Sequence, residues 1–296
     1  MQPGQPAVDF DELATVARRV RRTTLGLIYH AGSGHPGGSL SAVELLVYLY
    51  TRELRISPKA PDWPERDRFV LSKGHACPAL YATGAEIGLV SRRQLPCFRK
   101  LGGTLQGHPS VSHTPWVETS TGSLGQGFSA AIGMALGLRY LDSPARVYAM
   151  LGDGEMQVGE VWEGAMCAGH YRLGNLCAIL DYNKLQSDDL NENIMGLEPL
   201  QSKWEAFRWN VIEIDGHAFD QIANALAAAR NILDRPTLIV AHTIKGKGVT
   251  FMEGAAAWHG SVRLRPEELR RALADLNTPA EEIARYLDGT IWQDPA

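Results

Sequence analysis

Two polar side chains follow neighbouring apolar segments that are predicted to be strands. Asp153 comes directly after RVYAML, within Gly152-Asp153-Gly154, and Asn183 ends the next such segment, LCAILDYN. Because the carboxyl ends of parallel strands meet at one edge of a sheet, we expect these two side chains to lie together. Carboxylate and amide oxygens suit Mg²⁺ or Ca²⁺. Gly-Asp-Gly alone is more typical of a turn, but the asparagine at the end of the next strand favours a metal site.

Four histidines lie in glycine-bounded loops. They are His35, His75, His108 and His259, in SGHPGG, KGHA, QGHPS and WHG. A single loop histidine is usually a surface residue, whereas four in one chain indicate a polar cavity that handles hydroxyl protons near neutral pH. Other histidines have no such setting and are predicted to be structural or exposed: His30, His113, His170 and His217.

A glycine-rich segment precedes a predicted helix: Gly122-Ser123-Leu124-Gly125-Gln126-Gly127. The glycine order differs from that of a dinucleotide-binding loop, and no clear strand leads into it. Amides at a helix start can hold an anion or a ring edge. On glycine content alone, close helix packing is the simpler interpretation.

Predicted strands alternate with predicted helices, which favours an α/β fold whose parallel sheet carries helices on both faces. The strands are RFVLS, RVYAML, LCAILDYN, WNVIEIDG and PTLIVAHTI. They lack clean alternation, as expected when both faces of a sheet are buried. Residues 91–120 are irregular, and a loop of this length is more often functional than idle. The helices between the strands are PALYATGAEIG, the segment from GSLGQG to Tyr140, VWEGAMCAGHY and FDQIANALAAARNIL.

Residues 9–30 are predicted to form an amphipathic helix that docks by its apolar face. Its arginines favour a solvated face over a membrane-surface helix: Arg18, Arg19, Arg21 and Arg22. Ser41 followed by Glu44 predicts a capping box at the start of the next helix. Residues 261–296 are predicted to be a terminal helix and tail.

Composition excludes several classes of protein. The 296 residues are 45% hydrophobic with a formal net charge of −4, so there is no electrostatic case for nucleic acid or an anionic membrane. No apolar run approaches the roughly 20 residues that span a bilayer, and no secretion signal is expected. The four cysteines lack metal-site spacing and are predicted to be reduced. These features predict a soluble, cytoplasmic protein.

Several long motifs resemble one family in the right order. They are GSGHPGGSLS, RFVLSKGHACPALYA, TGSLGQGFSAAIGMALG, GDGEMQVGEVWEGAMCAGHYRLGNLCAILDYNKLQSD and HTIKGKGVTFMEG followed by WHG. Together they look like the N-terminal part of transketolase, from about Gly32 to Gly260. The resemblance implies a thiamine-diphosphate-binding domain over residues 1–260, with residues 261–296 as its C-terminal helix and tail.

The resemblance also implies roles for individual residues. The metal, Mg²⁺ with Ca²⁺ as an alternative, would be held by Asp153, Asn183 and the carbonyl of Leu185. His35 and His259 would lie near the reacting carbons and sugar hydroxyls, and His108 would line the same channel. Thiamine diphosphate would contact His75, Gly122, Ser123, Leu124, Gly154, Asn183, Gln186, Lys245 and His259.

The implied reaction is transfer of a two-carbon ketol unit from a ketose, or ketose phosphate, to an aldose. The family's full-length chain continues into a pyrimidine-binding domain and a C-terminal domain, and the former supplies the glutamate that activates the cofactor. The resemblance therefore implies that a separate C-terminal chain is the partner, with two copies of each chain. The donor and acceptor sugars stay open.

Three positions depart from the family pattern and one matches it. Val158 stands where a glutamate is usual, which puts coupling between two cofactor sites in doubt, while Glu163 matches an interface position. Gly38 replaces a hydroxyl residue near the diphosphate, and Ser110 stands where an acid is common.

Two other interpretations compete with this one. The chain could belong to another thiamine-diphosphate enzyme, such as a keto-acid dehydrogenase E1 subunit or a deoxyxylulose-phosphate synthase, but the histidine set argues against it. A non-catalytic homologue would be expected to have lost metal or histidine positions, and these are all present.

Overall fold

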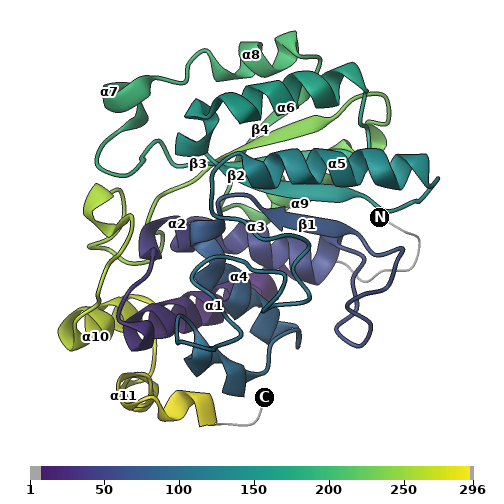
Figure 1. Cartoon of the computed structure of the whole chain (residues 1–296). Coiled ribbons are helices and arrows are strands. Elements are labelled where there is room, and N and C mark those ends of the chain that lie inside the picture. The colour runs from purple at the N-terminus through teal and green to yellow at the C-terminus, as the bar shows by residue number, and fades with distance from the viewer. Residues whose placement is uncertain (1–7, 294–296) are drawn as a thin grey trace.

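A five-stranded, fully parallel sheet organises the chain. The computed structural model describes residues 8–293, and the strands lie side by side in the order β1-β2-β3-β5-β4 (Figure 1). The last strand in the sequence is therefore inserted between the third and the fourth. The strands are β1 (Arg68–Leu71), β2 (Val147–Gly152), β3 (Leu176–Tyr182), β4 (Asn210–Asp215) and β5 (Thr237–His242).

Helices cover both faces of this sheet, which confirms the predicted α/β class (Figure 1). One face carries α5 (Gln126–Tyr140), α6 (Gly159–His170) and α8 (Leu200–Ala206); the other carries α1 (Phe10–Ala31), α3 (Val43–Tyr48), α4 (Cys77–Glu86) and α9 (Phe219–Asn231). The smaller helices are α2 (Pro36–Leu40) and α7 (Asn191–Met195), with a π-helical turn at Leu49–Glu53 and 3₁₀ turns at Gly74–Ala76, Arg92–Cys97, Gly154–Gln157, Ala256–Trp258 and Thr290–Gln293.

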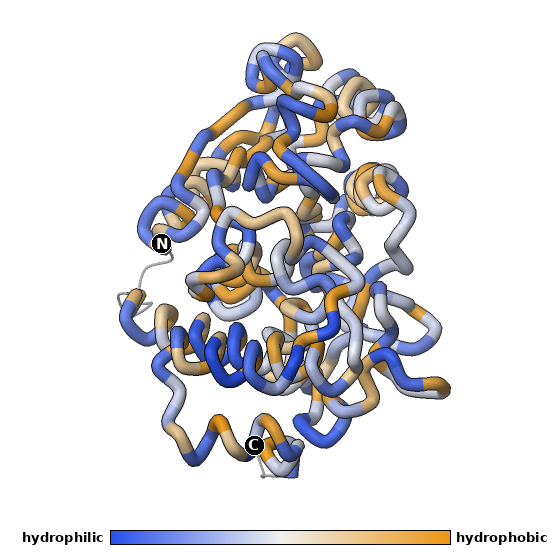
Figure 2. Tube along the Cα trace, turned by 90° about the vertical axis from the view of Figure 1, so that its left-hand side faces the viewer, coloured by the Kyte–Doolittle hydropathy of each residue, from blue (hydrophilic) through white to orange (hydrophobic). Residues whose placement is uncertain are grey.

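Each central strand contributes side chains to two separate hydrophobic cores, one on each face of the sheet. In β2, Met150 packs into the core that contains α1, whereas its neighbours Ala149 and Leu151 pack into the core that contains α5. Since successive side chains point to opposite faces, a strand buried on both faces must be apolar throughout. This explains why the sequence shows no clean alternation. On the outer helices, by contrast, hydrophobic residues gather on the side that packs inward and hydrophilic residues on the side that meets solvent (Figure 2).

Arg21 on α1 was predicted to be solvated, and this is wrong. Arg21 is 5% exposed and forms a two-pronged ion pair with Glu44, with both nitrogen–oxygen distances 2.7 Å. The same carboxylate contacts His217 Nδ1 at 2.9 Å. Burial opposes ionisation of Glu44, but the charge of Arg21 and the hydrogen bonds outweigh it and lower the pKa of Glu44 to about 2.

The predicted capping box at Ser41 and Glu44 is also wrong. α3 begins at Val43 with Ala42 as its N-cap, and no side chain caps it. The Ser41 hydroxyl instead donates to Asp181 Oδ2 at 2.6 Å. Both members of the predicted box are thus used in tertiary contacts, which override the local signal.

The C-terminal segment holds two helices where one was expected. They are α10 (Pro266–Asp275) and α11 (Ala280–Asp288), and both bury apolar residues against α1 and its neighbours. None of the helices within residues 8–293 is long and apolar enough to cross a membrane.

Replacing Glu44 with Gln should strongly destabilise the fold, because Arg21 would be left buried without a counter-charge. We expect a loss of about 3–5 kcal/mol in the free energy of unfolding, measured by urea denaturation at pH 7. In the wild type the folded pKa lies below the unfolded value, so this stability is present above about pH 4.5 and is lost as pH falls towards 2.

The matched control is Glu12→Gln. Glu12 pairs with Arg52 on the surface with its side chain 59% exposed, so its replacement should cost at most about 1 kcal/mol. Equal effects of the two substitutions would contradict the assignment.

Candidate active site

The carboxyl ends of β1, β2, β3 and β5 lie next to one another and carry the candidate site. Gly152 of β2 pairs with Asp181 of β3, and Tyr182 of β3 pairs with His242 of β5. The residues just beyond these ends are consequently brought to one edge. They include His75, Asp153, Asn183 and Lys245.

Asp153 and Asn183 are held by backbone amides of the turns after β2 and β3. Asp153 accepts hydrogen bonds from the amides of Gly154 at 2.8 Å and Lys184 at 2.5 Å, while Asn183 Oδ1 accepts from the Leu185 amide at 3.2 Å. Burial and the nearby charge of Asp181 raise the pKa of Asp153 to about 6. The Asp153–Lys184 contact ties the turn after β2 to the turn after β3, so the two predicted metal ligands are oriented together.

The Leu185 carbonyl, the third predicted metal ligand, accepts a hydrogen bond from a buried lysine. Lys245 Nζ donates to the carbonyl oxygens of Leu185 at 2.7 Å and Gln186 at 3.1 Å. Lys245 is 2% exposed, and burial lowers its pKa to about 8. This lysine therefore lies among the predicted cofactor contacts rather than in a solvated loop.

The donor chemistry fits a hard cation that a ligand helps to bind. In the described part of the chain, no group of three or more His, Cys, Asp or Glu side chains is arranged to hold a metal. An ion beside Asp153 would depend on amide, carbonyl and ligand oxygens, as Mg²⁺ with a diphosphate does. His259 also fits a ligand, because its buried Nδ1 has no hydrogen-bond partner within residues 8–293.

All four predicted loop histidines meet in one cluster. The ring centroid of His35 lies 5.3 Å from that of His75, 6.2 Å from that of His108 and 5.9 Å from that of His259, and His75 and His259 are 5.5 Å apart. They come from four separate segments of the chain, and the fold alone brings them together.

The cluster is uncharged at neutral pH. Burial lowers the pKa of all four imidazoles, to about 4 for His35 and His259 and well below the usual value for His75. The charge of Arg99 adds to the effect at His35 and His108, and that of Lys245 at His259. A neutral imidazole offers one donor and one acceptor, so the cluster can exchange protons with substrate hydroxyls.

The glycine-rich segment enters this site through a positive-φ turn. Gly125 has φ 87°, which favours glycine, and its amide donates to Glu155 Oε1 at 2.8 Å. Glu155 also accepts from Ser72 Oγ at 2.5 Å and the Gly152 amide at 3.1 Å. This buried carboxylate therefore fixes the start of α5 to the ends of β1 and β2. Gly122 lies against His108, and Ser123 and Leu124 lie in the same turn.

Sequence reasoning missed the buried pair Lys73 and Asp181. Asp181 is fully buried and accepts hydrogen bonds from Lys73, Ser41 and Thr243. Burial opposes its ionisation, but Lys73 and these hydrogen bonds hold the pKa of Asp181 below its usual value. A carboxylate inside the apolar strand LCAILDY was the available signal, because buried charges are paired.

Arg99 was also missed. It extends from the irregular loop 91–120 to His35 and Ser33. Nothing in its sequence setting, CFRKLGG, distinguishes it from a surface arginine.

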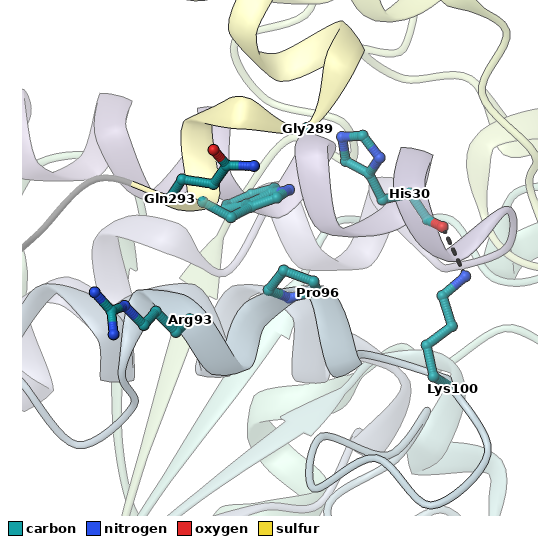
Figure 3. Close-up of a pocket in the computed structure, with 7 residues that line it drawn as sticks. His30, Arg93, Pro96, Lys100, Gly289 and Gln293 are labelled. Carbon is teal, nitrogen blue, oxygen red and sulfur yellow. Dashed lines mark hydrogen bonds between the residues drawn. The ribbon is translucent and has the colours of Figure 1, made fainter.

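A separate cavity of about 620 Å³ lies between α1, the 3₁₀ turn at Arg92–Cys97 and the C-terminal segment (Figure 3). Its lining includes His30, Arg93, Lys100 and Trp292, and Lys100 Nζ donates to the His30 carbonyl. None of the predicted site residues lines it, so it is distinct from the histidine cluster.

The four positions compared with the family pattern can also be placed. Gly38 faces the site, since a Cβ there would lie 3.3 Å from His75 Nε2. Val158 packs near Gly125, and Glu163 is exposed on α6. Ser110 Oγ is 2.9 Å from His113 Nδ1.

Comparison with known proteins defines the class to which this fold and site belong. Residues 13–281 match the family described as "Transketolase, thiamine diphosphate binding domain". The chain belongs to this family, as the motifs predicted.

The similar proteins include chains of nearly the same length. The chain is 46% identical over 265 residues to a 6-deoxy-6-sulfo-D-fructose transketolase subunit, SqwG, of Clostridium sp. strain MSTE9, covering 90% of this chain and 96% of that protein. It is 36% identical to one of the apulose-4-phosphate transketolase subunits of Phocaeicola vulgatus, covering 94% and 99%. These matches confirm the prediction of a transketolase N-terminal subunit.

Solved transketolase structures share the fold. The enzyme from Campylobacter jejuni superposes with a TM-score of 0.86 at 29% identity, covering 97% of this chain and 48% of that one. The enzyme from Leishmania mexicana gives 0.85 at 28% identity, covering 95% and 44%. The chain thus spans less than half of each of these larger proteins.

Replacing Glu155 with Gln should loosen the start of α5. The amide cannot accept from three donors at once, so at least one of them would face an NH₂ group. We expect a loss of about 1–3 kcal/mol in the free energy of unfolding and faster hydrogen exchange at the Gly125 and Gly152 amides. Glu163→Gln on exposed α6 is the control and should change stability by less than about 0.5 kcal/mol. Unchanged exchange at both glycines would show that Glu155 does not hold this turn.

Proposed function

We propose that this chain is the diphosphate-binding subunit of a two-chain transketolase. With a C-terminal partner chain, it transfers a two-carbon ketol unit from a ketose to an aldose, using thiamine diphosphate and Mg²⁺. The observation that carries the proposal is the meeting of four neutral histidines beside Asp153 and Asn183 at the carboxyl edge of the sheet.

In this proposal Asp153, Asn183 and the Leu185 carbonyl would hold the metal beside the diphosphate. Lys245, which contacts the Leu185 carbonyl, would then turn its ammonium group towards the anionic ligand. Gly122, Ser123, Leu124, Gly154, Gln186, His75 and His259 complete the cofactor contacts. When bound, thiamine diphosphate supplies the carbon nucleophile that carries the two-carbon unit.

The histidines supply proton handling. Breaking and forming a carbon–carbon bond beside a hydroxyl requires a proton to leave and return to that oxygen. His35 and His259 are placed to do this as neutral imidazoles, each with one N–H donor and one acceptor nitrogen, and their low pKa keeps both rings uncharged across the neutral range. His75 and His108 complete the polar wall around the same space.

The partner is inferred from relatives of this length, two of which are named as transketolase subunits. We propose a C-terminal subunit carrying the pyrimidine-binding and C-terminal domains, with two copies of each chain in the assembly. A cytoplasmic location is proposed on the four free cysteines.

The donor is proposed to be a ketose with an anionic group at its far end. The two relatives described above are named for a sulfonated sugar and for a sugar phosphate. The assay compares 6-deoxy-6-sulfofructose, fructose 6-phosphate and fructose at equal concentrations. We expect at least about a tenfold higher kcat/KM for a charged donor, because a single charge-assisted contact is worth that much. Preference for unsubstituted fructose would contradict the proposal.

Reconstitution tests the function itself. The chain is co-purified with its candidate partner and assayed for ketol transfer with thiamine diphosphate and Mg²⁺. Activity should need both chains and should be abolished by Asp153→Ala, which removes the carboxylate ligand. Asp234→Ala changes the same charge on an exposed loop before β5 and should leave activity intact.

Three outcomes would decide against the proposal. Full activity of this chain alone would overturn the need for a partner. Consumption of a 2-keto acid in place of a ketose would favour another thiamine-diphosphate enzyme. Tight cofactor binding without any transfer would favour a non-catalytic homologue.

A further inference from the structure

Arg99 occupies a strained backbone position that directs its side chain into the histidine cluster. Its φ is 56°, in the left-handed region that residues other than glycine seldom adopt, and its amide donates to the Leu105 carbonyl at 2.9 Å. Such strain persists only when surrounding contacts hold it, and it is commonest where a side chain has a task.

The guanidinium has two anchors, one on each terminal nitrogen. Nη1 donates to Ser33 Oγ at 3.0 Å, and Nη2 lies 3.4 Å from His35 Nδ1. Space behind the guanidinium is kept by Gly107, where a Cβ would come within 2.9 Å of Arg99 Nε. Loop, serine and glycine together place one donor group against one nitrogen of the imidazole.

We propose that Arg99 is a positioning residue that fixes the tautomer and the orientation of the His35 ring. A guanidinium only donates and stays charged in proteins, so the nitrogen it faces must present a lone pair. Nδ1 of His35 is therefore the acceptor, and the neutral ring carries its proton on Nε2. The consequence for catalysis rests on the function proposed above: His35 would present an N–H donor to a substrate oxygen.

The charges around His35 agree with this arrangement. Burial is the largest cause of the lowered pKa of His35, followed by the charges of Arg99, His108 and Lys245. The rings of His75 and His259 also face His35. No carboxylate is among the groups that shift its pKa. Removal of the Arg99 charge should consequently raise the pKa of His35 and admit the doubly protonated ring at a higher pH.

Arg99 also anchors its own loop, and this role must be distinguished from the positioning of His35. Two substitutions distinguish them. Arg99→Gln removes the charge, whereas Arg99→Lys keeps the charge but loses the fork that reaches Ser33 and His35 together. Lys100→Gln is the matched control, because the neighbouring lysine carries the same charge but donates to the His30 carbonyl.

The first measurement is nitrogen NMR of the full chain labelled with ¹⁵N-histidine, with His35→Asn used to assign the signal. We expect the Nε2–H tautomer in the wild type and in Lys100→Gln. Arg99→Gln should raise the pKa of His35 towards its usual value, and Arg99→Lys should leave that pKa low while the two tautomers mix. A wild-type Nδ1–H tautomer, or a His35 signal unchanged in Arg99→Gln, would overturn the proposal even if stability fell.

The second measurement is the pH profile of kcat/KM in the two-chain enzyme. Arg99→Gln should lower kcat/KM by about 10- to 100-fold at neutral pH and move the acidic limb of the profile to higher pH. A loop anchor alone would lower the amount of folded enzyme without moving that limb. If no ketol transfer occurs with any sugar while the NMR results hold, the proposed function fails and the positioning role stands.

Discussion

The buried pair of Lys73 and Asp181 is the contact on which the arrangement of the site depends. Lys73 follows the end of β1 and also donates to the Gly38 carbonyl of α2. Asp181 lies in β3 and also accepts from Ser41, the C-cap of α2, and from Thr243, which follows β5. Neither charge could be buried alone, because the desolvation of each is offset only by the other and by these hydrogen bonds. Four segments are therefore held in one geometry. His75, Asn183 and Lys245 each lie two residues from a member of this network, and Asp153 follows Gly152, which pairs with Asp181 in the sheet.

Much of the fold could be predicted because it depends on the pattern of hydrophobic residues along the chain, which has one dominant cause, the burial of apolar side chains. Apolar runs of strand length alternating with amphipathic helices leave little choice but a parallel sheet covered on both faces. The failures share a cause as well. Ser41, Glu44 and Arg21 carry local signals for a helix cap and a solvated face, yet each is drawn into a buried tertiary pair. Whether a charge is solvated depends on what lies opposite, and a single sequence does not display that.

The candidate site divides in the same way. Asp153, Asn183 and the four histidines could be named because they combine an informative residue type with a strand end or a glycine-bounded loop. Lys73 and Arg99 could not, since one follows a strand like many surface lysines and the other lies in an irregular loop. Their importance comes from burial and from distances to Asp181 and His35. Residues that act through another residue leave no pattern of their own in the sequence.

The position of β5 in the sheet has a consequence for synthesis. β4 pairs with β5 among the described strands, and β3 has β5 as its second neighbour, so both have an open edge until β5 joins them. A chain growing on the ribosome can pair its first three strands early, but it cannot complete the sheet before residues 237–242 have emerged. Lys245 and His259 follow later still. The growing chain would therefore keep two unpaired strand edges exposed until late in synthesis, which is when protection from aggregation matters most, and cofactor capture would be among the last events of assembly.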